Sequence, residues 1–193
     1  MSSLKERIEL LESDLKAVPS RISVYHDLPF AILRYDPTDE WDLRREVKLL
    51  ATRLEAMGKE VHEIRMSELL WQAIEETEGI DEIVGLERSR GYIAAQDQVT
   101  TYLSDRDWRP LAGLLAERMA KLNASKNIVF LTRVAAMAPG IYHMSKLLDQ
   151  MQGKTRVTTI LFYPGSIEGT TGLRFMNLKD RDALGNYRVK IYG

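Results

Sequence analysis

The sequence contains no cysteine among its 193 residues. This absence excludes disulfide bonds, cysteine nucleophiles and every metal site built on thiolates, and it favours a reducing compartment. Histidine is also scarce: His26, His62 and His143 are the only ones, and none has the spacing to another that would hold zinc. The sequence therefore predicts no metal centre and no redox site.

Long apolar runs and an excess of charge of one sign are missing too. No stretch approaches the roughly 18 uninterrupted apolar residues of a membrane span, and residues 1–16 are too highly charged for a signal peptide. Twenty-seven basic and 28 acidic side chains leave a formal net charge of −1 at pH 7, so the composition favours neither nucleic acid nor anionic lipid. We expect a cytoplasmic protein without membrane contact.

The composition that remains is that of a globular protein. Hydrophobic residues make up 45% of the chain and charged residues 28%, and the length suits one domain over residues 1–193. Residues 1–18 predict an amphipathic helix, because apolar residues recur in steps of three and four. Ser3 and Glu6 are spaced as a capping box at the start of this helix.

Three short apolar runs and one alternating segment predict the strands of a central sheet. Two of them, Ile128–Leu131 and Val157–Tyr163, are continuous, which is typical of parallel strands buried on both faces. A helical pattern separates successive strands, and such units form parallel, right-handed crossovers. We therefore predict an α/β fold whose mostly parallel sheet is flanked by helices, with strands at residues 30–35, 59–64, 128–131 and 157–163.

Helices fill most of the intervening sequence. Residues 43–57 predict an amphipathic helix that Gly58 ends, and residues 68–78 predict another with Ser67 as its N-cap. Residues 80–122 show helical patterns without a strand, which predicts a helical insertion. The remaining predicted elements are a helix at residues 141–151 and two short C-terminal strands at residues 172–176 and 187–192.

Gly153-Lys154-Thr155 is similar to the end of a phosphate-binding P-loop, but its surroundings do not fit. The motif needs a glycine where Leu148 stands, a strand before it and a helix after it. Here a helix comes first and a strand follows. We interpret the tripeptide as a helix end followed by a polar turn.

The segment that follows the strand at residues 157–163 lies where open α/β sheets usually bind their ligands. Ser166 is not a nucleophile elbow, because Pro164 replaces the glycine that this motif requires. The three glycines of this segment either form turns or make room for an anion, and both interpretations stay open. The residues that an anion or a partner would contact here are Tyr163, Gly165, Ser166, Gly169, Gly172 and Arg174.

The C-terminal tail combines basic and aromatic residues, a mixture that suits a protein interface or nucleic acid. Side chains alternate along a strand, so Val189 and Ile191 are predicted to face the core. The opposite face would then carry candidate partner-binding residues. These residues are Arg188, Lys190 and Tyr192. Arg181, in the turn before the strand, is a further candidate.

The same C-terminal region resembles the BrxB family, the small B component of BREX phage-defence systems. The similar runs are Leu161–Ser166, Gly172–Met176, Asp180-Arg181 and Asn186–Gly193. The resemblance implies a non-catalytic accessory protein, without a cofactor, of a system that methylates host DNA and blocks phage replication. It also implies association with other BREX proteins, above all with the alkaline-phosphatase-like component PglZ.

Two alternatives stay open beside this adaptor. One is a degenerate nucleotide- or anion-binding domain that uses the loop Gly165–Gly172 together with Arg174. The other is a DNA-binding accessory subunit that uses the basic and aromatic tail, against which the overall charge argues. The sequence contains no complete catalytic constellation, so we expect no enzymatic activity.

Overall fold

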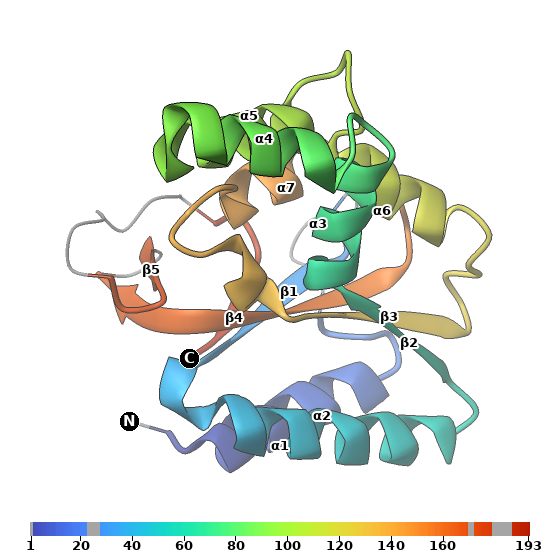
Figure 1. The fold of residues 1–193 in the computed structure, drawn as a ribbon. Helices are drawn as coiled ribbons and strands as arrows, with labels where there is room; N and C mark the ends of the chain where they lie inside the picture. Colours follow the sequence, from blue (N-terminus) through green and yellow to red (C-terminus); the bar gives the residue numbers. More distant parts are fainter. Residues whose placement is uncertain (1, 23–27, 170–171, 179–186) are drawn as a thin grey trace.

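A computed structural model of the chain shows a central sheet with helices on both faces (Figure 1). The structure describes residues 2–22, 28–169, 172–178 and 187–193. Within them the sheet has six strands, of which five lie in the order β2-β3-β4-β1-β6 and run parallel, while β5 pairs antiparallel with β4. The predicted fold class, an α/β protein with a mostly parallel sheet, is confirmed.

The strands form where the apolar runs were found, because the central ones are covered on both faces. Every residue of β3 is buried, whereas in β2, at the edge of the sheet, Ile64 alone is buried. The bounds are β1 Phe30–Tyr35, β2 Glu60–Arg65, β3 Asn127–Thr132, β4 Thr158–Glu168, β5 Gly172–Phe175 and β6 Lys190–Tyr192.

Two helical layers enclose the sheet. Helices α1 (Leu4–Lys16) and α2 (Glu40–Glu55) cover one face, and α3 (Met66–Glu75), α6 (Leu111–Met119) and α7 (Met144–Met151) cover the other (Figure 1). Alternate residues of β1 therefore enter different cores: Phe30 and Ile32 pack with the second layer, Ala31 and Leu33 with the first. The capping box predicted at the start of α1 is present.

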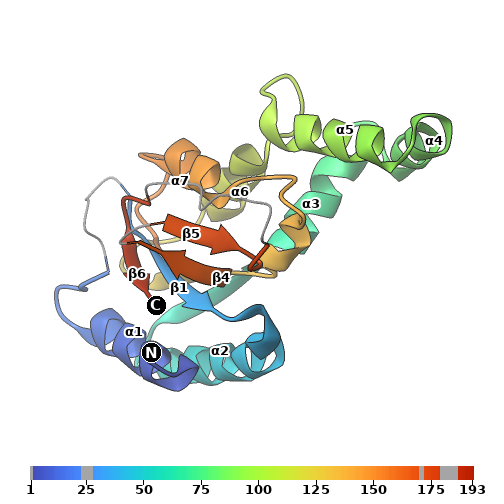
Figure 2. The same ribbon diagram turned by 90° about the vertical axis from the view of Figure 1, so that its left-hand side faces the viewer.

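Helices α4 (Ile80–Arg90) and α5 (Tyr92–Ser104) form a hairpin that extends away from the sheet at the far end of α3 (Figure 2). Gly91 lies between them with a φ of 88°, a conformation that glycine adopts readily. A small core of their own holds the hairpin to α3 through Ile74, Ile83, Ala95 and Tyr102. This hairpin occupies the first part of the predicted helical insertion, and α6 returns the chain to the sheet.

The structure corrects several predicted boundaries. Helix α3 begins at Met66, directly after β2, so Ser67 lies inside the helix and Arg65 occupies the N-cap position without a side-chain cap. Helix α7 starts at Met144 and not at residue 141, because a short 3₁₀ helix and turns occupy the preceding residues. Met57 is exposed, since α2 has already ended at Glu55.

Gly165 allows β4 and β5 to approach each other closely. Its φ is 150°, and a Cβ atom at this position would lie 2.0 Å from the backbone oxygen of Arg174 on β5. Gly165→Ala is therefore expected to lower the free energy of unfolding by about 1 to 3 kcal/mol, measured by urea denaturation. Gly85→Ala is the control: that glycine is exposed in α4 with open space around it, so alanine should leave stability unchanged or raise it.

Candidate functional site

The predicted ligand loop after β4 is instead a continuation of the strand. β4 runs on to Glu168 and pairs with β5, so Gly165, Ser166 and Arg174 meet as strand neighbours. Arg174 forms an ion pair with Glu168 across this hairpin. The expectation of an irregular loop is wrong, because the hydrogen bonds to β5 keep the backbone extended. Gly169 and Gly172 lie at the end of the hairpin, and the two residues between them are outside the described part.

Tyr163 lies in the core and not at a binding surface. Its ring packs edge-on against Phe175 at 5.7 Å and against Tyr187 at 6.0 Å between ring centroids. Burial raises the pKa of its phenol well above the usual value. The side chain thus joins β4, β5 and the C-terminal segment.

The tail residues alternate as predicted, but their second face is not open. Val189 and Ile191 pack against the core on one side of the sheet, and Tyr192, only 2% exposed, lies in the core under α1. Lys190 donates to Asp14 of that helix. Of the tail residues predicted to contact a partner, Arg188 is exposed and Arg181 lies outside the described residues.

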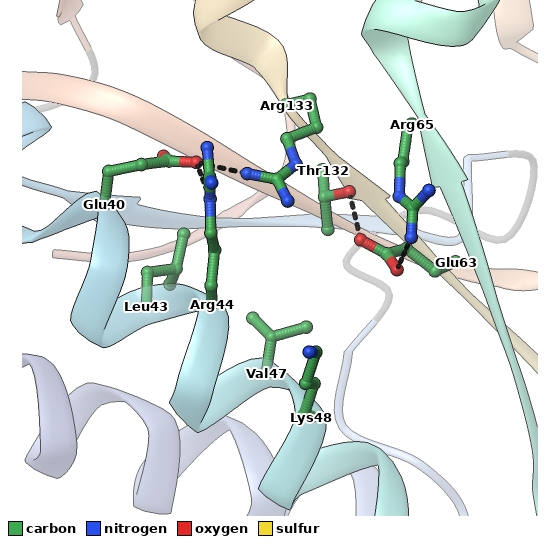
Figure 3. A pocket seen from close by; sticks show the side chains of 9 residues that line it. All are labelled: Glu40, Leu43, Arg44, Val47, Lys48, Glu63, Arg65, Thr132 and Arg133. Carbon is green, nitrogen blue, oxygen red and sulfur yellow. Dashed lines mark hydrogen bonds and ion pairs between the residues drawn. The ribbon is translucent and has the colours of Figure 1, made fainter.

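A charged crevice lies at the carboxyl ends of β2 and β3, facing the first turns of α2 (Figure 3). The carboxyl ends of the parallel strands β2 and β3 lie here beside the first turns of α2, which is the usual ligand position in open α/β sheets. Its volume is about 90 Å³. It is lined by Glu40, Leu43, Arg44, Val47, Lys48, Glu63, Arg65, Thr132 and Arg133.

Glu40 organises one wall of this crevice. Its carboxylate accepts hydrogen bonds from the Tyr35 hydroxyl, from Arg44 Nε at 2.8 Å and from Arg133 Nη1 at 3.2 Å. Burial and the neighbouring Glu40 carboxylate both raise the pKa of Tyr35, so this phenol stays a hydrogen-bond donor. Arg133 directs its side chain here from a left-handed backbone conformation with a φ of 58°.

The opposite wall is neutralised by its own ion pairs. Glu63 accepts from the Thr132 hydroxyl at 2.7 Å and from Arg65, whose guanidinium also binds Glu68. Lys48 is different, because its ammonium has neither a hydrogen bond nor an ion pair within the described part of the chain. In the sequence, the only indication of this crevice is the spacing of Arg44 and Lys48, which lie four residues apart in a predicted helix.

An apolar groove lies elsewhere, between α3, the α4–α5 hairpin and the segment around Pro139. It is open to solvent, has a volume of about 290 Å³, and has Glu87 and Gln96 as its only polar lining residues. Trp71 and Tyr92, which line it, are 53% and 60% exposed. Its apolar lining comprises Leu70, Trp71, Ile74, Ile80, Ile83, Tyr92, Ala95, Val99, Ala138, Pro139 and Ile141.

Neither surface carries a recognisable metal centre. Within residues 2–22, 28–169, 172–178 and 187–193, no three His, Asp or Glu side chains are grouped so that they could hold a metal ion. His143 directly precedes α7 and lines neither surface, and His62 lies on the edge strand β2. In the same residues, no helix combines the length and the apolar character needed to cross a membrane.

The fold and these surfaces define an α/β protein with a mostly parallel sheet, a charged crevice at the strand ends and an apolar groove on a helical projection. The family model of the BREX protein BrxB matches residues 62–191, more than half of the chain. The chain therefore belongs to the BrxB family and is a component of a BREX phage-defence system. Comparisons with curated proteins and with solved structures found no match.

Proposed function

We propose that the protein is a non-catalytic adaptor of its BREX system and that the apolar groove is its docking surface for PglZ. The observation that carries this proposal is the groove itself. Its lining is apolar apart from two side chains, and it exposes two large aromatic residues, Trp71 and Tyr92, to solvent. Folded proteins usually expose contiguous apolar patches of this kind where a partner binds.

The composition of the groove suits a protein partner. Tryptophan and tyrosine are enriched among the few residues that supply most of the binding energy in protein interfaces, above all when apolar neighbours exclude water around them. Ile93, next to Tyr92, adds a further exposed apolar side chain to the α4–α5 hairpin. Because the hairpin extends away from the sheet (Figure 2), a partner can reach the surface that does not pack on α3.

Two further considerations support an adaptor. Membership of the BrxB family places the chain in a system of several proteins, which supports a partner from that system. In the crevice, Glu40 and Glu63 are held in ion pairs with arginines, and the described residues that line it include neither serine nor histidine. PglZ is the partner that we propose, from the resemblance of the C-terminal residues to BrxB proteins.

Co-expression tests this proposal. Tagged protein, produced together with the other components of its BREX system, should retain PglZ through washing at moderate salt, since specific interfaces bury roughly 1,200 Å² or more. Retention of a different component would refute the choice of partner. Retention of none would refute the adaptor function.

A further inference from the structure

The crevice at the strand ends carries an excess of positive charge that the docking proposal does not use. Arg44 on α2 and Arg133 after β3 both bind the carboxylate of Glu40, and Lys48 lies one turn further along α2. On the facing wall Glu63 and Glu68 share Arg65, so that wall carries one negative charge in excess. Around the cavity, four cations against three carboxylates leave one positive charge in excess, and Lys48 is the cation without an ion pair among the described residues (Figure 3).

The two arginines are held in place and still have donors to offer. Each gives one nitrogen to Glu40: Arg44 its Nε atom and Arg133 its Nη1 atom. The Arg44 guanidinium also stacks on Trp41, with Cζ 4.3 Å from the ring centroid. Within the part of the chain that the structure describes, the remaining guanidinium nitrogens have no hydrogen-bond partner and can donate to a ligand, and little side-chain freedom has to be lost when one binds.

We infer that this crevice binds a phosphate group. The excess positive charge and the unpaired ammonium of Lys48 suit an oxyanion, and guanidinium groups match the oxygen geometry of a phosphate. A cavity of about 90 Å³ is far smaller than the roughly 300 Å³ or more that encloses a whole small molecule, so a single oxyanion would enter it. Its place at the carboxyl ends of parallel strands is the usual ligand position in open α/β sheets.

This site differs from the anion site predicted at Gly165–Gly172, where the structure places a β-hairpin. It is also independent of PglZ docking, because the groove is formed by α3, α4 and α5. The phosphate can be free in solution or be part of a nucleotide, since both present the same group.

Calorimetric titration of the full chain with inorganic phosphate at low ionic strength tests the inference. The wild-type protein should show saturable binding, and Lys48→Met should weaken it about tenfold through the loss of one charge-assisted contact. Lys48 is exposed and has no partner in the described residues, so this variant should fold. Lys121→Met is the matched control: it removes the same charge from an exposed turn outside the crevice, and its affinity should stay within about twofold of wild type.

Titrations with AMP and ATP identify the source of the phosphate. Affinity at least about tenfold higher than for inorganic phosphate would assign the site to a nucleotide, and equal affinity would assign it to the free ion. No saturation up to about 50 mM phosphate would overturn the inference. Equal weakening by Lys48→Met and Lys121→Met would overturn it as well, because it would show diffuse attraction and no defined site.

Discussion

Replacement of Asp14 by alanine is expected to lower the free energy of unfolding by about 2 to 4 kcal/mol. The Asp14 carboxylate is buried and accepts hydrogen bonds from Lys190 Nζ at 2.5 Å and from the Tyr192 hydroxyl at 2.6 Å. These contacts join the first helix to the last strand. Alanine would leave the buried hydroxyl and the half-buried ammonium without an acceptor, and such groups are costly to leave unpaired.

Two further variants make the Asp14 experiment decisive, with urea denaturation as the measurement. Tyr192→Phe removes one donor and keeps the ion pair, so it should cost only about 1 kcal/mol. Asp42→Ala removes a carboxylate that is 61% exposed and paired with Arg45, and its effect should stay within about 0.5 kcal/mol. If Asp14→Ala were as stable as Asp42→Ala, the coupling of α1 to β6 through this carboxylate would be refuted.

The contribution of Asp14 to the free energy of unfolding should decrease at low pH. Burial alone would raise the pKa of this carboxyl, but the hydrogen bonds from Lys190 and Tyr192 outweigh burial and hold the pKa below its usual value of 3.8. A carboxyl with a lowered pKa in the folded state stabilises the fold above its unfolded pKa and loses that effect as the pH falls through the folded value. The stability difference between wild type and Asp14→Ala should therefore be full near pH 7 and shrink below about pH 4.

The strands were predictable because burial on both faces leaves a direct mark in the sequence. Continuous apolar runs such as Ile128–Leu131 arise where neither face of a strand meets water. The start of α3 was not predictable from Ser67, because the chain passes from β2 into the helix without a turn that would need a cap. In the tail, alternation correctly separated Val189 from Tyr192, but it could not reveal that α1 covers the second face.

Both candidate surfaces depend on contacts between distant residues, which periodicity does not encode. Glu40 and Arg133 meet because β1 and β3 are parallel and end at the same edge of the sheet, on either side of β4, and nothing in their local sequence indicates that contact. One residue indicates the groove in the local sequence. Trp71 lies in α3 away from the buried face that holds Leu69 and Ala73, and a tryptophan outside the buried stripe of a helix is a candidate for partner binding.

The largest effect on partner binding is expected from removing both exposed aromatic residues of the groove. Trp71→Ala combined with Tyr92→Ala should weaken the affinity for PglZ by at least about 100-fold, since a single interface hot spot contributes about 2 kcal/mol or more. Both side chains are more than half exposed, so the fold should persist, and an unchanged midpoint in thermal denaturation would verify this. Neither residue touches the crevice, so phosphate binding should also be unchanged.

Trp41→Ala is the matched control for this double variant. Trp41 is 76% exposed, more than Trp71, and lies on α2, on the other side of the sheet from the groove (Figure 1). Both variants therefore lose an exposed tryptophan, but only Trp71→Ala/Tyr92→Ala loses side chains of the groove. The affinity of Trp41→Ala for PglZ should stay within about threefold of wild type.

The most direct test is the dissociation constant between the purified protein and purified PglZ, measured by calorimetry for wild type, the Trp71→Ala/Tyr92→Ala variant and Trp41→Ala. A protein that docks PglZ through its groove gives saturable binding for wild type and Trp41→Ala, and a loss of at least about 100-fold for the double variant. Wild-type binding that the double variant retains in full would contradict docking at the groove. The absence of any binding between the two wild-type proteins would contradict the adaptor function itself.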